Sequence, residues 1–235
     1  MIRLNKIVAT YTTVRGQVNA VDGVDLTIPS GNIVGIAGES GCGKSTLLKV
    51  IYGDLIYPLA LTSGSVQYGF HGKTDEEVTT KDIKDYWFSR ISYIPQSSMS
   101  SLNPVIRIRK QFVDFMDRDK PESEIIDEIK DYVKGLDLPP ESIDAYPHQL
   151  SGGMRQRIMV AMGTFFKPDV ILADEPTAAL DSQRGRQVME LFKKVAHEQN
   201  GAVIVVTHDH RALDVFDTIY EMEDGRIRLK ANDSN

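Results

Sequence analysis

The residues with the clearest chemical meaning lie between positions 38 and 46, where the order of amino acids fits the phosphate-loop pattern G-x-x-x-x-G-K-[ST]. Glycines let such a loop turn with its backbone N–H groups pointing inward, and the helix that follows attracts anions at its N-terminus. The lysine would add a full charge at the terminal phosphates, and the serine hydroxyl would be a ligand for Mg²⁺. We therefore predict that a nucleotide polyphosphate binds to Gly38, Glu39, Ser40, Gly41, Cys42, Gly43, Lys44, Ser45 and Thr46.

Further polar residues follow short apolar segments, which we interpret as buried strands. These segments cover residues 33–37, 91–94, 170–173 and 202–207. In an open parallel sheet, ligand chemistry gathers at the carboxyl ends of the strands. We therefore expect one site at this edge of the sheet, formed by the residues that follow the segments: Gly38, Gln96, Asp174, Glu175 and His208.

The remaining pattern predicts the elements around that sheet. Residues 2–11 and 18–28 alternate in part between apolar and polar, which indicates strands with one solvated face, and residues 62–70 indicate another strand. Residues 184–199 have a helical composition, and residues 218–230 indicate a closing hairpin around Asp224-Gly225. The polar end, residues 231–235, is expected to fray.

Between residues 106 and 146 the chain becomes charged and helical in pattern. Its apolar residues recur at helical spacing and predict one stripe that packs on the rest of the domain. The stripe consists of Ile125, Ile126, Ile129, Tyr132, Val133 and Leu136. We therefore predict a helical insert at about residues 97–163 within one domain that spans residues 1–235.

Composition narrows the class of protein. The 235 residues carry a formal charge of −6, from 27 basic and 33 acidic residues, and no polybasic run, so we expect no nucleic acid partner. No apolar stretch reaches the ~20 residues that cross a bilayer, and the N-terminus lacks a signal-peptide core, so we expect a soluble intracellular chain. The single cysteine excludes an internal disulfide and any Cys-ligated zinc or iron–sulfur site.

Two further features have more than one interpretation. Residues 150–156 lead from glycines into a second helix, which suggests a second anion site. Tyr11 lies near the end of the first predicted strand, where its ring could stack on a nucleotide base or simply be an ordinary strand aromatic. Spacing alone does not choose between these two roles.

Three motifs in order, at residues 38–46, 150–156 and 172–176, resemble the nucleotide-binding subunits of ATP-binding-cassette (ABC) transporters. The resemblance implies an α/β fold, the ABC ATPase version of the P-loop NTPase fold, with a mostly parallel core sheet, an N-terminal antiparallel β subdomain and an inserted α-helical subdomain. It also implies an ATPase that uses ATP and Mg²⁺.

The resemblance also assigns a role to individual residues. Tyr11 would stack on adenine, and Glu175 would be the general base for the attacking water. Gln96 would reach Mg²⁺ and that water, while Lys44 and His208 would contact the γ-phosphate. Mg²⁺ ligands would come from Ser45, Gln96 and Asp174, and the signature that acts on a partner subunit's nucleotide would be Ser151, Gly152, Gly153 and Gln156. Asp181 would lie in the dimer loop.

A narrower resemblance concerns residues 101–105, 146–149 and 153–157, which are similar to the dipeptide, oligopeptide and nickel importer branch. This resemblance implies a second ATPase subunit, identical or different, and transmembrane permease subunits. An extracytoplasmic substrate-binding protein would be an indirect partner, and the chain would lie on the cytoplasmic face of the membrane. Oligosaccharide importers share this branch, so the substrate class stays open. Many members of the branch also continue into a C-terminal extension that this sequence does not include.

Two other functions compete with transport. A soluble ABC ATPase that acts on DNA or ribosomes generally carries a long coiled-coil insert or two cassettes, and this sequence has neither. A nucleotide sensor that does not hydrolyse ATP is disfavoured by the carboxylate of Glu175. An ATPase subunit of a peptide importer is therefore the leading hypothesis.

Overall fold

A mostly parallel sheet forms the centre of the protein. The computed structural model describes residues 1–70, 78–96, 101–114, 121–208 and 210–230. The sheet has the order β5-β6-β7-β3-β8-β9, in which β9 alone pairs antiparallel. Its strands are β3 (Asn32–Ala37), β5 (Ile91–Ile94), β6 (Val170–Asp174), β7 (Ala202–Thr207), β8 (Thr218–Glu223) and β9 (Arg226–Leu229). The predicted parallel core sheet is confirmed.

A second sheet, entirely antiparallel, is built by the N-terminal part of the chain. It has the order β2-β1-β4, with β1 at Ile2–Thr13, β2 at Gly16–Ile28 and β4 at Leu59–Tyr68. Both predicted N-terminal strands are present and extend to the turn that joins them. Strand β4 begins and ends earlier than its pattern indicated, so Gly69 and Phe70 lie outside it.

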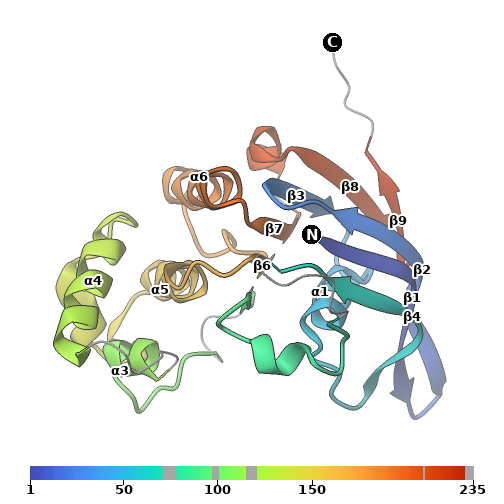
Figure 1. The fold of residues 1–235 in the computed structure, drawn as a ribbon, viewed down its shortest axis with the longest axis horizontal. Helices are drawn as coiled ribbons and strands as arrows, with labels where there is room; N and C mark the ends of the chain where they lie inside the picture. Colours follow the sequence, from blue (N-terminus) through green and yellow to red (C-terminus); the bar gives the residue numbers. More distant parts are fainter. Residues whose placement is uncertain (71–77, 97–100, 115–120, 209, 231–235) are drawn as a thin grey trace.

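Helix α1 (Lys44–Tyr52) contacts strands of both sheets, as Figure 1 shows for the blue and cyan part of the ribbon. Helices α5 (Gly152–Phe165) and α6 (Ser182–Gln199) cover the other face of the parallel sheet. Alternate residues of the strands face opposite sides, so Leu172 packs in the core around α1, whereas Ile171 packs in the core around α5 and α6. The sheet thus separates two hydrophobic cores.

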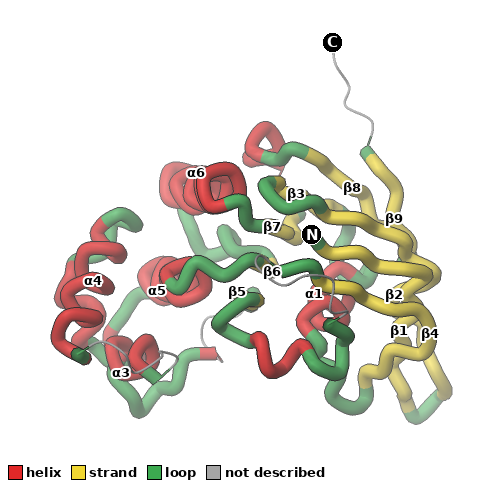
Figure 2. The backbone as a smooth tube through the Cα atoms, viewed as in Figure 1, coloured by secondary structure: helices red, strands yellow, loops and turns green. Residues whose placement is uncertain are grey.

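The described residues between β5 and β6 form helices and no strand. Helices α3 (Ile108–Val113) and α4 (Glu122–Lys134) come first, and short 3₁₀ turns at Pro140–Asp144 and Pro147–Gln149 lead into α5. Figure 2 shows this helical part on the side of the molecule opposite the yellow strands. Ile125, Ile129 and Val133 of the predicted stripe are buried in the core that also contains residues of α5 and α6.

Further 3₁₀ turns lie at Ile83–Tyr86 and His210–Val215. None of the helices in the described ranges is both long enough and apolar enough to cross a membrane. The predicted fraying end, residues 231–235, lies outside the described residues.

Candidate functional site

The phosphate-loop residues connect β3 to α1 in a tightly confined position. Gly43 has φ +111°, and a Cβ atom there would lie 2.1 Å from the carbonyl oxygen of Ala20. A Cβ atom on Gly38 would lie 2.3 Å from the carbonyl oxygen of Met222. Any side chain at either position would collide with backbone, which explains the need for glycine in physical terms.

Lys44 is the first residue of α1, and its side chain is folded back into the loop. The ammonium group donates hydrogen bonds to the carbonyl oxygens of Gly38, at 2.8 Å, and Glu39, at 2.7 Å. The side chain is buried, and its charge therefore lies inside the curve of the loop. A phosphate bound in the loop would accept hydrogen bonds from an ammonium group that is already in position.

Ser45 and Asp174 meet although they are 129 positions apart in the chain. The Ser45 hydroxyl donates to Asp174 Oδ1 at 2.9 Å. Burial raises the pKa of Asp174, and the hydrogen bonds from Ser45 and Tyr93 oppose this shift. The pair provides a hydroxyl and a carboxylate, which are oxygen ligands of the kind that Mg²⁺ prefers.

Glu175 and His208 form a second pair beside the first. Glu175 is 6% exposed and has φ +49°, and its amide donates to the carbonyl oxygen of Val206. His208 Nδ1 and Glu175 Oε1 lie 2.7 Å apart, and the His208 backbone amide donates to Oε2 at 3.3 Å. Both oxygens of Glu175 are therefore held by one residue at the end of the neighbouring strand β7.

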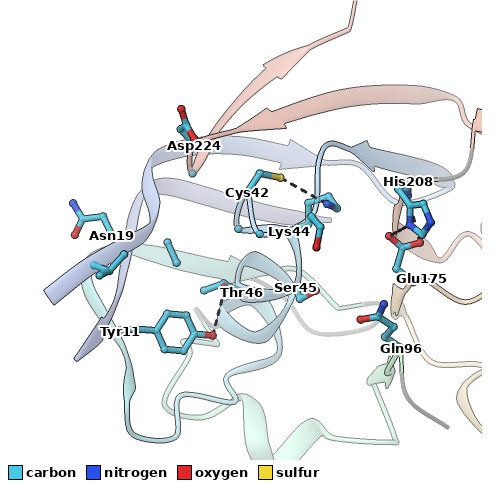
Figure 3. Close-up of a pocket in the computed structure, with 16 residues that line it drawn as sticks. Tyr11, Asn19, Cys42, Lys44, Ser45, Thr46, Gln96, Glu175, His208 and Asp224 are labelled. Carbon is cyan, nitrogen blue, oxygen red and sulfur yellow. Dashed lines mark hydrogen bonds and ion pairs between the residues drawn. The ribbon is translucent and has the colours of Figure 1, made fainter. Parts of the chain in front are cut away.

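The loop residues Ser40 to Thr46, together with Glu175 and His208, line a cleft of about 670 Å³, which is in the size range of small-molecule sites. Figure 3 shows Tyr11 and Asn19 at one end, Gln96, Glu175 and His208 at the other, and Lys44 to Thr46 between them. The Tyr11 hydroxyl lies 3.3 Å from Thr46 Oγ1. The long cleft can therefore take a molecule with an aromatic group at one end and phosphates along its length.

The residues at the ends of β3, β5, β6 and β7 do come together, as predicted. Gln96, Glu175 and His208 line the cleft itself, and Asp174 is hydrogen-bonded to Ser45 in it. Five other lining residues were not predicted to belong to the site: Val18, Asn19, Ala20, Asp224 and Gly225. The first three lie on β2 in the antiparallel sheet. The residue pattern within β2 does not indicate that this strand lies beside the phosphate loop.

The second loop-to-helix junction lies apart from this cleft. Ser151 is exposed and caps α5, because its hydroxyl accepts from the Met154 amide at 3.3 Å. Gly153 lies close to the segment that precedes α6, since a Cβ atom on Gly153 would lie 3.3 Å from the Ala179 carbonyl oxygen. None of the predicted signature residues is among the described residues that line the cleft. Within one chain, therefore, the signature and the phosphate loop do not meet.

Gln156 differs from the other three signature residues. Its side chain is 1% exposed, whereas Ser151 is exposed and both glycines are partly exposed. A buried amide does not present itself to a partner subunit. The burial of Gln156 therefore does not fit the predicted contact with a partner subunit, whereas the exposure of residues 151–153 is compatible with it.

Asp181 has a role in its own chain that the sequence did not suggest. It caps α6, since its carboxylate accepts from the Arg184 amide at 2.9 Å. That backbone hydrogen bond, together with the one from the Arg184 guanidinium, lowers the pKa of Asp181. The half-exposed carboxylate lies at the surface beside the signature, where a second molecule could reach it.

Comparisons with known proteins agree with this geometry. A family described as ABC transporter matches residues 21–178. The dipeptide transport ATP-binding protein DppD of Bacillus subtilis (strain 168) is 36% identical over 216 residues, which are 89% of this chain and 63% of that protein. The oligopeptide transport ATP-binding protein OppD of Salmonella typhimurium is 33% identical over 215 residues, with the same coverage. This chain thus spans 63% of the length of these two relatives.

Solved structures are similar over nearly the whole chain. A dimeric structure of the ATP-binding cassette MJ0796, in a post-hydrolysis state bound to ADP and Pi, has a TM-score of 0.85 and 29% identity. It covers 98% of both chains. A second dimeric structure of the same bacterial ABC transporter cassette has a TM-score of 0.85 and 30% identity.

Proposed function

This chain belongs to the ABC transporter family, and we propose that it is the subunit that binds and hydrolyses ATP to power an importer. One observation carries the proposal. Strands β3, β5, β6 and β7 deliver a phosphate loop, a glutamine, two carboxylates and a histidine to one cleft. Such a set suits phosphoryl transfer, in which the protein positions groups and stabilises charge instead of forming covalent bonds.

The order of residues along the cleft supports one orientation of the nucleotide. Tyr11 would stack on adenine at the end of the cleft that β1 and β2 form. The triphosphate would follow the loop of residues 38–46 to the N-terminus of α1, where backbone N–H groups and the Lys44 ammonium meet its charge. The γ-phosphate would then lie at the end of the cleft that Glu175 and His208 form.

The donor set fits Mg²⁺. Ser45 Oγ and Asp174 Oδ1 are oxygen atoms 2.9 Å apart, and Gln96 lines the same cleft as Ser45. No group of three or more His, Cys, Asp or Glu residues suited to a metal occurs among the described residues. Mg²⁺ commonly binds through one or two side chains together with substrate phosphates and water, so Ser45, Asp174 and Gln96 would hold it. When bound, it would neutralise charge on the phosphates.

Hydrolysis would then depend on Glu175. Its carboxylate would orient a water molecule in line with the γ-phosphorus and accept a proton from it as the new P–O bond forms. The bond between the γ-phosphorus and the bridging oxygen breaks, which leaves ADP and phosphate. His208 would contact the γ-phosphate while its ring keeps Glu175 in place through the 2.7 Å hydrogen bond.

A second ATPase subunit, a copy of this chain or a different one, would complete the site. The similar cassette structures are dimers. Residues 151–153 lie at the surface at the start of α5, away from the cleft of their own chain. They would contact the γ-phosphate in the partner's cleft, and Asp181 would lie at the same interface.

Gly152→Asp is predicted to abolish hydrolysis and leave ATP binding intact. The nearest atom to a Cβ on Gly152 is the Arg155 guanidinium at 4.0 Å, so the chain has room for a side chain there. A carboxylate in the first turn is even favourable for α5 by itself. In the dimer, however, it would repel the partner's γ-phosphate. The measurement is phosphate release, compared with equilibrium binding of ATP to the isolated chain.

The matched control is Gly152→Asn, which has nearly the same size but no charge. It should keep much more activity than the aspartate variant. Equal loss in both variants would mean that volume and not charge matters at this position, and full activity in both would remove residues 151–153 from the site.

The imported substrate is, in our proposal, a peptide. The relatives named above are dipeptide and oligopeptide transport proteins, and the motifs at residues 101–105 and 146–149 are similar to that branch. The chain would lie on the cytoplasmic face of the membrane, bound to transmembrane permease subunits. An extracytoplasmic binding protein would deliver the peptide to those subunits.

Purification of the chain from membranes of its own cells tests this assignment. We expect permease subunits to copurify, and ATP hydrolysis by the complex to rise when peptide-loaded binding protein is added. Stimulation by oligosaccharides instead would change the substrate class. Recovery of the chain with ribosomes or DNA, and without permease, would contradict the transport function.

A further inference from the structure

Asp174 is held by a residue that no motif pointed to. Its Oδ1 accepts from Ser45, while its Oδ2 accepts from the Tyr93 hydroxyl at 3.1 Å. Tyr93 lies on β5 and pairs with Leu172 of β6, so its side chain can reach the end of that strand. Asp174 is 4% exposed, and each of its carboxylate oxygens has a hydroxyl donor.

The ring of Tyr93 is itself held in place by two other aromatic rings. It stacks on Tyr52 with ring centroids 5.3 Å apart, and Tyr52 stacks on Trp87 at 4.5 Å with planes 3° from parallel. The Trp87 indole N–H donates to the Tyr52 carbonyl oxygen at 2.8 Å. Because Tyr52 is the last residue of α1, the stack connects the far end of the phosphate-loop helix to the end of β6.

We propose that Tyr93 is a positioning residue that holds the Asp174 carboxylate toward Ser45 and thereby increases the affinity of the site for Mg²⁺. The inference rests on the proposed function, because Ser45 and Asp174 matter as a metal site only if nucleotide binds beside them. Without the phenol, Oδ2 would lack that donor in a buried place and the carboxylate could rotate. Groups that orient metal ligands from behind commonly change metal affinity or activity by about 10–100-fold.

Tyr93→Phe tests the proposal, because it keeps the ring in the stack and removes only the hydroxyl. A non-hydrolysable ATP analogue is bound at increasing MgCl₂ concentrations, and the concentration that gives half of the Mg²⁺-dependent gain in affinity is measured. We expect this concentration to rise about 10-fold in the variant. Affinity for the analogue in EDTA should be unchanged, because the loop and Tyr11 are untouched.

Tyr52→Phe is the matched control, since it removes a hydroxyl from the same stack and leaves the bond between Tyr93 and Asp174 in place. It should titrate like the unsubstituted protein. The Tyr93→Phe change is also made in an Asp174→Asn background, where it should shift the titration no further. The single Trp87 provides a fluorescence check that the stack is intact in every variant.

Three results would overturn the role of Tyr93. These are an unchanged Mg²⁺ titration in Tyr93→Phe, an equal shift in Tyr52→Phe, or a shift that persists in the Asp174→Asn background. Loss of the stack in Tyr93→Phe, seen as a change in Trp87 fluorescence without nucleotide, would also do so, because the residue would then be structural. If the unsubstituted protein itself bound no ATP analogue, the proposed function would fail instead.

Discussion

Glu175→Gln is expected to reduce ATP hydrolysis by about 10²–10⁴-fold, the usual contribution of a general base. Glutamine has nearly the same shape, and its carbonyl oxygen can still accept the hydrogen bond from the His208 amide. It cannot accept the proton of the attacking water. ATP binding should therefore survive, and the protein should remain dimeric with ATP for longer. Phosphate release, ATP affinity and molecular mass in the presence of ATP are the three measurements.

Glu190→Gln is the control for the glutamine substitution. Glu190 is an exposed residue on α6 that pairs with Arg186 and does not line the cleft. The Glu190→Gln protein should therefore retain full activity. A Glu175→Gln protein that hydrolyses ATP at the unsubstituted rate would exclude Glu175 as the base. This result would also favour the alternative hypothesis of a nucleotide sensor, in which the carboxylates serve only to bind the nucleotide.

Lys44→Ala is expected to weaken ATP binding by about 10–100-fold, because hydrogen bonds to a charged group contribute about 1.5–3 kcal/mol. Hydrolysis should fall with it by about 10²–10³-fold, since the lysine also stabilises charge on the reacting phosphate. The two substitutions should therefore separate cleanly. Glu175→Gln binds without hydrolysing, whereas Lys44→Ala binds poorly. Equilibrium binding of ATP at fixed Mg²⁺ distinguishes them.

Lys49→Ala is the control for the loss of a lysine, because Lys49 lies in the last turn of the same helix and does not line the cleft. It should bind ATP normally. Lys44 also bonds to two loop carbonyls, so thermal unfolding of both variants shows whether the loop has lost its structure. Normal ATP affinity in a folded Lys44→Ala protein would contradict the phosphate site.

Strand ends were predictable to within a few residues. The segments at 91–94 and 202–207 match β5 and β7, because buried parallel strands are continuous apolar runs and stand out from their neighbours. Composition predicts a helix from residue 184, whereas α6 begins at Ser182. The family resemblance assigns Asp181 only to a dimer loop, although this residue also caps α6. A cap and an interface residue can be the same aspartate, and local sequence does not distinguish them.

The phosphate loop and its chemistry were readable because the whole motif is contiguous, so the turn, the helix and the lysine follow from neighbouring residues. The backbone groups that contact this loop could not be predicted from the sequence. The carbonyl oxygens of Ala20 and Met222 confine Gly43 and Gly38, and the Gly225 amide donates to the Cys42 carbonyl oxygen. These partners come from both sheets and are distant in the chain.

The sequence by itself predicted a phosphate loop, with carboxylates at the end of another strand, together with the approximate position of most strands. Only the tertiary structure decided that Tyr93 donates a hydrogen bond to Asp174, that Gln156 is buried, and that residues 151–153 do not line the cleft of their own chain. The physical reason is the range of the interactions. Motifs and periodicity act between neighbours, whereas strand order and helix packing bring together residues that no local pattern relates.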